Sequence, residues 1–248
     1  MIKLIVASSK QKASKKAAQI IIELLNKKPN CVLGLATGQS PILTYQELIQ
    51  DHLKNKRSYS NVTTFNLDEY VGVNVNNKIS YHYYMKTNLF DYLDIKKENT
   101  FIPQGDSNYL EYANKYDDLI ALKNGIDLQI LGLGENGHIG FNEPGSNPNS
   151  KTRVVNLTKS TIKANSRFFN SIEDVPKQAI SMGIKSILSA KKILLLAFGS
   201  KKANAIKELF KAQKLKKPNI NVPCTYLINH ENVVVILDLK AAALLKEI

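Results

Sequence analysis

The chain alternates short apolar runs with stretches of helical periodicity, and this alternation constrains its fold more than any other feature. Several of the runs are rich in β-branched residues and apolar on both faces, as strands in a helix-covered parallel sheet are. The runs lie at residues 2–7, 32–36, 62–67, 128–134, 179–184, 193–199 and 233–239. We therefore expect a series of buried strands joined by helices.

Two of the intervening stretches, residues 10–27 and 202–213, place apolar residues at the spacing of one helix face. Strands alternating with helices predict an α/β fold: a doubly wound, mostly parallel sheet with helices on both faces, in the Rossmann-like manner. We find no repeat, low-complexity tract or linker that marks a boundary. The 248 residues are therefore expected to form a single domain spanning 1–248.

Composition excludes several classes of protein. No run approaches the roughly 20 apolar residues that span a bilayer, and lysines follow the first run, so we expect a cytoplasmic chain without a signal peptide or membrane contact. The net charge is +13, but single lysines spread along the whole chain carry it and only three arginines occur, so we expect no nucleic-acid partner. Cys31 and Cys224 each fall at a predicted strand without metal-ligand spacing, which favours buried thiols over a metal site or disulfide.

In such sheets ligands bind beyond the carboxyl ends of the strands, so the residues that follow each strand are the candidates for a site. After the strand at 32–36 come Thr37, Gly38, Gln39 and Ser40, with Pro41 expected to open a helix that Ser40 caps. Gly38 permits a tight turn with exposed amides, and a helix start favours anions. This turn suits a phosphate, although many turns of this kind only cap a helix.

Two adjacent acids, Asp68 and Glu69, follow the strand at 62–67. In a partly buried cleft one of them can have a raised pKa and act as a general base. A helix cap or a surface pair explains the same residues equally well.

The stretch from 131 to 146, LGLGENGHIGFNEPGS, is the most informative part of the chain. Its glycines are too dense for a helix or a regular strand, and they surround His138, which Glu143 can orient. A lone histidine is often structural, but a glycine-rich loop after a buried strand favours a functional role. Two cations complete the set: Arg167, in a segment able to close over a site, and Lys202, whose position at a helix start is unfavourable unless an anion lies there.

Together these segments resemble the glucosamine-6-phosphate deaminases, the glucosamine/galactosamine-6-phosphate isomerase family, and they follow in the family's order over most of the chain. The segments are LGLATGQSPILTY, TTFNLDEYVGV, SYHYYM, LGLGENGHIGFNEPGS, ANSRFF and SKKA. The resemblance implies conversion of glucosamine 6-phosphate to fructose 6-phosphate and ammonia, in amino-sugar catabolism and without a cofactor or metal. The ring opens, a proton moves from C2 to C1, and an imine is hydrolysed.

The resemblance also implies roles for single residues. Asp68 matches the base that takes the C2 proton, His138 the acid and base of ring opening, and Glu143 the carboxylate that supports it. The phosphate would be held by Thr37, Gly38, Gln39, Ser40, Arg167 and Lys202, with Tyr81 near the pocket. The segment around Arg167 is similar to the family's mobile lid.

Two departures from the family pattern stand out. Many relatives have Asp where this chain has Asn136, so we expect a shifted pH profile. Allosteric members use a basic pair after the NEP motif, and here Arg153 is matched while Val155 replaces the lysine. We therefore expect little activation by N-acetylglucosamine 6-phosphate.

Three other functions fit parts of this pattern. A 6-phosphogluconolactonase-like hydrolase of sugar phosphates shares the fold and the phosphate turn, but the DEY and GHIGFNEP segments favour the deaminase. A sugar-phosphate-sensing regulator would need a DNA-binding module, for which the expected first strand at Ile2 leaves no room. A nucleic-acid-binding module would need clustered basic and aromatic residues. The pattern leaves open whether the chain is a monomer or a homo-oligomer.

Overall fold

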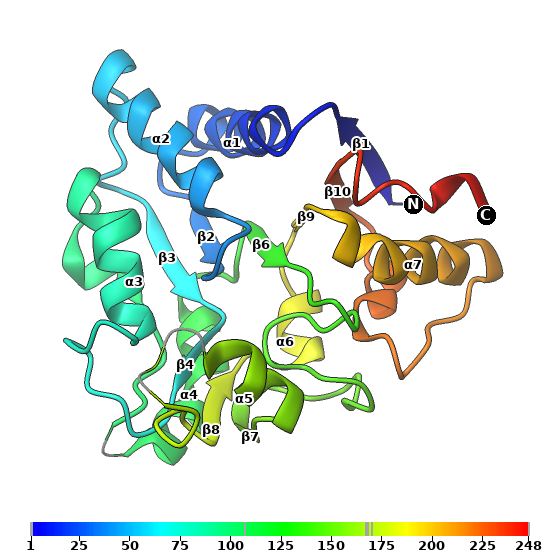
Figure 1. The fold of residues 1–248 in the computed structure, drawn as a ribbon. Helices are drawn as coiled ribbons and strands as arrows, with labels where there is room; N and C mark the ends of the chain where they lie inside the picture. The colour runs from blue at the N-terminus through cyan, green and yellow to red at the C-terminus, as the bar shows by residue number, and fades with distance from the viewer. Residues whose placement is uncertain (1, 107, 167–168, 170, 248) are drawn as a thin grey trace.

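A computed structural model describes residues 2–106, 108–166, 169 and 171–247. Seven strands form one parallel sheet, whose arrangement is seen in Figure 1. In the order in which they lie side by side, they are β1 (Lys3–Ala7), β10 (Val233–Asp238), β9 (Ile193–Ala197), β6 (Leu128–Gly132), β2 (Val32–Leu35), β3 (Thr63–Asn66) and β5 (Thr100–Phe101). The predicted α/β class is confirmed.

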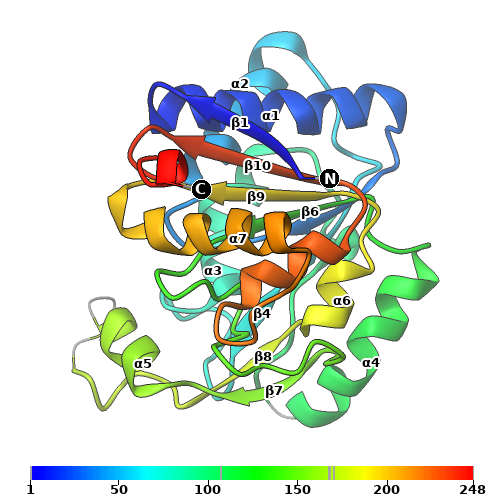
Figure 2. The ribbon, with the colours of Figure 1, turned by 90° about the vertical axis from the view of Figure 1, so that its right-hand side faces the viewer.

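Helices cover both faces of this sheet, with α1 and α2 on one side and α6 and α7 on the other (Figure 2). The α-helices are α1 (Lys10–Lys27), α2 (Ile42–Asn55), α3 (Tyr81–Asn88), α4 (Tyr109–Leu122), α5 (Lys159–Asn165), α6 (Ile184–Leu188) and α7 (Ala203–Leu215). Short 3-10 helices are η1 (Phe90–Tyr92), η2 (Lys97–Asn99), η4 (Ser200–Lys202), η5 (Pro223–Asn229) and η6 (Leu245–Glu247). The predicted helix at 10–27 has the bounds of α1, where the Ser9 side chain accepts a hydrogen bond from the Lys12 amide.

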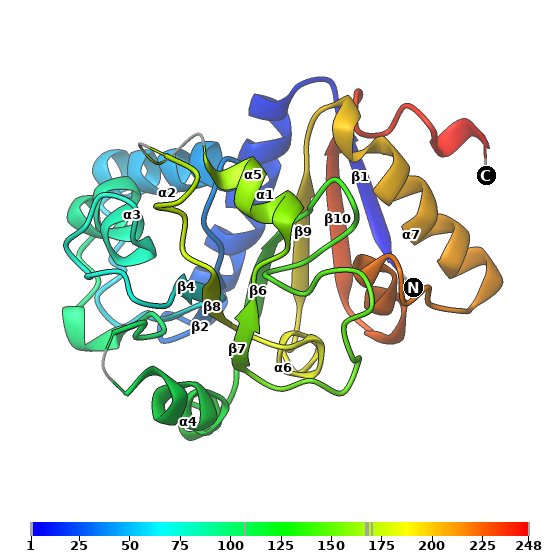
Figure 3. The same ribbon diagram turned by 60° about the horizontal axis from the view of Figure 1, so that its bottom comes forward.

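A second, antiparallel sheet of three strands lies beside the first. It consists of β4 (Asp68–Tyr70), β8 (Gln178–Ser181) and β7 (Arg153–Asn156), in that order, with α4 and α5 near its opposite ends (Figure 3). The expectation that residues 179–184 add a strand to the parallel sheet is therefore wrong. Most of β8 is buried, so it has the apolar composition of a parallel strand although its partners are antiparallel.

The chain passes from one sheet to the other through Leu67. Its amide donates to the Leu35 carbonyl beside the parallel sheet, and its carbonyl accepts from the Met182 amide just after β8. Asp68 begins β4 directly after this junction. The junction therefore brings Asp68 to the carboxyl end of β3, where a parallel sheet binds ligands.

Each sheet has its own hydrophobic cluster. The large cluster surrounds the parallel sheet, in which β9 and β10 are buried at every position, and a small one centres on Tyr70, Phe141 and Leu157. Both cysteines are buried and free, as predicted, but Cys224 lies in η5 and not in a strand. Within the described residues, no helix has both the length and the apolar character needed to span a bilayer.

Gly183, just before α6, allows a close backbone approach, and this generates a test of the fold. A Cβ at Gly183 would lie 2.1 Å from the Ser150 carbonyl oxygen and 2.4 Å from that of Lys151. Because backbone cannot swing aside, we expect Gly183→Ala to lower the free energy of unfolding by about 3 kcal/mol, the upper end of overpacking costs. Urea denaturation measures this effect.

The matched control is Gly125→Ala. Gly125 has φ +76° with open space around its Cβ position, so the cost is backbone strain alone, about 1–2 kcal/mol. Equal losses in the two variants would contradict the packing around Gly183.

Candidate functional site

A cavity of about 220 Å³ opens where the chain leaves the carboxyl ends of β2, β3 and β6. Residues of α3 and α5 complete its wall. The lining residues are Ala36, Thr37, Gly38, Gln39, Ser40, Leu67, Asp68, Tyr81, Gly132, Leu133, Gly134, His138, Gly140, Phe141 and Thr161. The cavity thus brings together the predicted turn at 37–40, Asp68, Tyr81 and His138.

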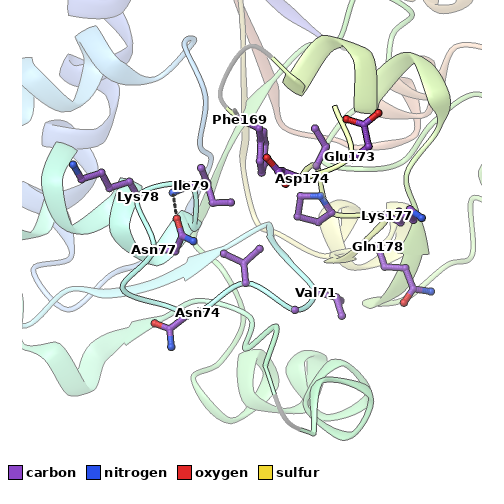
Figure 4. Close-up of a pocket in the computed structure, with 14 residues that line it drawn as sticks. Val71, Asn74, Asn77, Lys78, Ile79, Phe169, Glu173, Asp174, Lys177 and Gln178 are labelled. Atoms are coloured by element: carbon purple, nitrogen blue, oxygen red, sulfur yellow. Dashed lines mark hydrogen bonds between the residues drawn. The ribbon is translucent and has the colours of Figure 1, made fainter. Parts of the chain in front are cut away.

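A wider cleft, of about 1030 Å³, lies between residues 71–79 and the segment that leads into β8. Figure 4 shows its side chains, with Asn77 bonded to the Ile79 amide on one wall and Phe169, Asp174 and Lys177 on the other. Among the predicted site residues that the structure describes, none lines this cleft. Cavity size therefore does not indicate the site here.

The turn at 37–40 is held through its carbonyl groups. The Tyr84 hydroxyl donates to the Gly38 carbonyl at 2.5 Å, and the Lys10 ammonium donates to the Gln39 carbonyl at 2.9 Å. Gly38 adopts φ +79°, a left-handed conformation that favours glycine. Side chains of α3 and α1 thus hold the carbonyl groups of the turn. The turn lies just before the amino-terminal end of α2, a position that favours an anion.

The predicted cap of α2 is shifted by one residue. The helix begins at Ile42 with Pro41 in the cap position, and no side chain bonds to its first amides. Ser40 instead lies beside β6, since a Cβ on Gly132 would be 3.5 Å from its hydroxyl oxygen. Predicted helix boundaries are commonly wrong by a residue. Because Pro41 and not Ser40 is the cap residue, Ser40 is available to line the cavity.

The two adjacent acids at the start of β4 have different tasks. Glu69 is buried and accepts hydrogen bonds from the amides of Tyr70, Tyr81 and His82 and contacts the His82 ring at 3.0 Å. It therefore caps the start of α3, which is the helix-cap alternative weighed for the pair. Asp68 lines the cavity instead, because successive side chains on a strand point to opposite sides.

Asp68 lies in an environment that disfavours its charge. It is 6% exposed, and no described residue donates a hydrogen bond to its carboxylate. Burial, with the nearby charge of Glu69, raises the pKa of Asp68 to about 8. A buried carboxyl of this kind, facing a cavity, is suited to taking up and releasing a proton near neutral pH.

His138 is held by a relay of side chains behind the cavity wall. Its Nδ1 lies 2.7 Å from Asn136 Oδ1, which also accepts from the His138 amide at 3.1 Å. Asn136 Nδ2 donates to Glu143 Oε2 at 2.7 Å, and the Thr161 hydroxyl donates to Glu143 Oε1. Asn136 and Glu143 do not line the cavity themselves but contact two residues that do, His138 and Thr161.

The relay has one consistent direction. Burial alone raises the pKa of Glu143, but the His138 imidazole 3.6 Å away and the hydrogen bonds from Thr161 and Asn136 outweigh it and lower the pKa to about 2. An ionised Glu143 only accepts, so the amide nitrogen of Asn136 faces it and Oδ1 faces His138. His138 Nδ1 therefore carries the hydrogen, and the neutral ring has its lone pair on Nε2.

Gly134 makes room for the imidazole. A Cβ at this position would lie 2.3 Å from ring atoms of His138, while the Gly134 amide donates to the His138 carbonyl at 2.9 Å. The ring thus packs against bare backbone. This accounts for one of the glycines of the 131–146 loop by packing and not by turn geometry.

Tyr81 and Phe141 line the cavity and belong to an aromatic cluster. The Tyr81 and Phe141 rings are stacked, with centroids 6.4 Å apart, and Tyr70 lies 4.9 Å from Tyr81. Phe169 packs edge-on against Tyr70 at 6.1 Å. These rings keep that side of the cavity apolar, which is consistent with the raised pKa of Asp68.

The two predicted cations, Arg167 and Lys202, have different outcomes. Arg167 lies outside the described residues. Lys202 occupies the cap position of α7, at a helix start as predicted, but it is not among the lining residues. Arg153 lies on β7 with a buried Nη1, and the expectation about activation stays a prediction.

Thr161 and Lys10 contact the predicted site residues but were not themselves predicted. Thr161 reaches Glu143 only because α5 folds over the 131–146 loop, and Lys10 reaches the turn only because α1 begins beside it. Neither position carried a local signal. Among the described residues, no group of three His, Cys, Asp or Glu side chains is arranged to hold a metal ion.

Comparison with known proteins agrees with this geometry. The profile of the family described as glucosamine-6-phosphate isomerases/6-phosphogluconolactonase matches residues 7–236. The chain belongs to this family. A curated glucosamine-6-phosphate deaminase of Mycoplasma mycoides is 54% identical over 241 residues, 97% of this chain and 96% of the relative. One from a Thermoanaerobacter species is 50% identical over 246 residues, 99% and 96% of the two chains.

Two solved structures also match. A monomeric glucosamine-6-phosphate deaminase superimposes with a TM-score of 0.94 at 41% identity, covering 98% of this chain and 99% of the other. A 6-phosphogluconolactonase from Trypanosoma brucei gives a TM-score of 0.79 at 20% identity, covering 98% of both chains, which shows a shared fold alone.

The raised pKa of Asp68 generates a stability prediction. The folded protein keeps a proton on Asp68 up to about pH 8, whereas the unfolded chain releases it near pH 4. Between these values the folded state binds more protons, so the free energy of unfolding falls as pH rises. Asp68→Asn has no carboxyl at this position and so avoids this loss of stability as pH rises. At pH 8 its melting temperature should exceed that of the wild type by several degrees, because 1 kcal/mol of stability corresponds to about 2–4 °C.

Thermal denaturation from pH 5 to pH 8.5 measures the difference, with Asp118→Asn, at an exposed position on α4, as the control. The gain in Asp68→Asn should grow with pH while the control stays flat. A gain that is the same at every pH would argue against a buried proton on Asp68.

Proposed function

We propose that this protein is a glucosamine-6-phosphate deaminase, converting glucosamine 6-phosphate and water to fructose 6-phosphate and ammonia. The observation that carries the proposal is that Asp68, His138 and the turn at 37–40 line one cavity. A base, an acid/base and an anion-binding turn are what an aldose-to-ketose shift on a sugar phosphate needs. The names of relatives 50–54% identical support the same reaction.

His138 is proposed to open the sugar ring. Its Nε2 lone pair takes the proton of the C1 hydroxyl, and the resulting imidazolium returns a proton to the ring oxygen, so the C1–O5 bond breaks and an aldehyde forms. The Glu143 carboxylate, 3.6 Å from Nδ1, stabilises the imidazolium. His138 ends this step neutral and ready for the next turnover.

Asp68 is proposed to carry the proton between carbons. In its ionised form it removes the hydrogen at C2, giving an enolamine, and returns the proton to C1, which leaves an imine at C2. Water adds to the imine carbon and ammonia departs, giving the ketone. The C2 ammonium of the bound sugar favours the charged form of Asp68, which offsets the effect of burial that raises its pKa.

The phosphate is proposed to bind at the turn and the start of α2, with Lys202 and Arg167 contributing charge. Anchoring the far end of the sugar supplies binding energy that positions C1 and C2 at the reacting groups. We further propose that residues 1–248 act as one domain. Because a phosphorylated sugar is charged and does not cross a bilayer unaided, the cytoplasm is the proposed location.

An assay of ammonia release from glucosamine 6-phosphate tests the proposal. Asp68→Asn and His138→Gln should each lower kcat by about 10²–10⁴-fold, the usual contribution of a general acid or base, while keeping the native circular dichroism spectrum. Asp118→Asn should retain the wild-type rate.

The alternative hydrolase is tested in the same preparation with 6-phosphogluconolactone as substrate. Lactone hydrolysis without ammonia release from the amino sugar would overturn the deaminase proposal.

The asparagine at 136 generates a prediction for pH dependence. Asn136→Asp places a negative charge 2.7 Å from His138 Nδ1 and favours the imidazolium, so the kcat profile should move to higher pH. Asn149→Asp, in the exposed loop, serves as the charge control. Identical profiles for Asn136→Asp and the wild type would refute the assigned relay.

A further inference from the structure

Lys10, the first residue of α1, connects two loops at the carboxyl ends of the parallel strands. Its ammonium donates to the Gln39 carbonyl at 2.9 Å, on the turn that follows β2. The same ammonium lies 5.9 Å from the centre of the Phe198 ring, in the segment between β9 and η4. Gln39 lines the cavity, and η4 ends at Lys202. Lys10 therefore joins the two segments that are proposed to hold the phosphate.

The charge of Lys10 is not neutralised by an ion pair. Both of its contacts, a carbonyl and an aromatic ring, are uncharged, and the ion pairs found among the described residues do not include it. Lys201, at the same edge of the sheet, instead pairs with Glu135 at 3.3 Å. Asp238, at the end of β10, accepts hydrogen bonds from two backbone amides. The positive charge of Lys10 is thus available to a further, anionic group.

The helix starts at this edge of the sheet lack the acids that stabilise such positions. The helices α1, α2 and α7 have no acidic residue in their first turns. A lysine at the first position of α1 opposes the helix dipole, and this cost is offset where an anion lies nearby. The Lys10 side chain is half-buried and reaches the turn before α2. The charges around the turn are therefore arranged for an anion beyond the backbone amides alone.

Resting on the proposed function, we propose that Lys10 is a positioning residue for the phosphate, which holds the turn at 37–40 and adds its positive charge to the anion site. A carbonyl at the wall of an anion site repels the anion with the negative end of its dipole, and an ammonium bound to that carbonyl offsets the repulsion. Because Lys10 does not itself line the cavity, its charge acts over a distance and is screened by salt. It acts on binding of the phosphate end and not on proton transfer.

The test measures binding of inorganic phosphate to the ligand-free protein. The backbone amide ¹H and ¹⁵N shifts of residues 37–40 report occupancy at this turn. Lys10→Met keeps an apolar stem and removes the ammonium, whereas Lys10→Arg keeps a charge that donates to carbonyls. At low salt Lys10→Met should raise the Kd for phosphate about three- to tenfold. The difference should shrink as salt increases, and Lys10→Arg should bind phosphate nearly as the wild type does.

The matched control is Lys12→Met. Lys12 is an exposed lysine two residues along α1, and two residues turn a helix by about 200°, so its side chain points away from the turn. This variant loses the same charge and should keep the wild-type Kd. Equal losses of affinity in Lys10→Met and Lys12→Met would show an effect of net charge alone and overturn the proposal. A loss in Lys10→Met that is independent of salt and not restored by arginine would also overturn it.

Kinetics provide the second measurement. At low salt Lys10→Met should raise the KM for glucosamine 6-phosphate by a factor similar to that for phosphate and leave kcat unchanged, because the lost interaction is with a part of the sugar that does not react. A Lys10→Met protein whose turn binds phosphate like the wild type would overturn the proposal at any turnover. Weakened phosphate binding by Lys10→Met, with no ammonia release from the wild type, would support the role of Lys10 and count against the deaminase function alone.

Discussion

The backbone of Leu67 hydrogen-bonds to both sheets, and the geometry of the site depends on this junction. Leu67 alone separates the end of β3 from the start of β4, so the side chains of Asp68 and Glu69 point in opposite directions from a fixed place. Asp68 faces the cavity and Glu69 caps α3. The same helix supplies Tyr81 to the wall and Tyr84 to the turn at 37–40, so one junction positions Asp68, the aromatic wall and that turn.

Two carboxylates near the cavity have opposite electrostatic environments. Asp68 has a pKa raised to about 8 because burial is not compensated by any donor from the described residues. Glu143 has a pKa lowered to about 2 because its neighbours outweigh burial. Separating the two values lets one carboxyl exchange protons near neutral pH while the other remains a fixed charge that orients an imidazole. Burial without a hydrogen-bond donor raises the pKa of Asp68, and donors that outweigh burial lower the pKa of Glu143.

The sequence predicted what depends on local pattern and missed what depends on tertiary contact. Buried parallel strands, α1 and the glycine-rich loop around His138 follow from periodicity and composition, and residue type alone made Asp68 a candidate. The small antiparallel sheet was missed because a buried strand has the same apolar composition whichever way its partners run. Thr161 was missed because its contact with Glu143 joins segments that only the folded chain brings together. Which member of the Asp68 and Glu69 pair faces the cavity also required the strand geometry.

The packing of the His138 ring on Gly134 has an evolutionary consequence. The imidazole occupies the volume that any side chain at 134 would take, and the three atoms nearest to such a Cβ all belong to the His138 ring, so a substitution there displaces the ring first. Folding and ligand capture are then separable from turnover by one change in the gene. A duplicated copy carrying such a change would persist as a stable receptor for sugar phosphates, which is a short route from a catalyst to a sensor on the same scaffold.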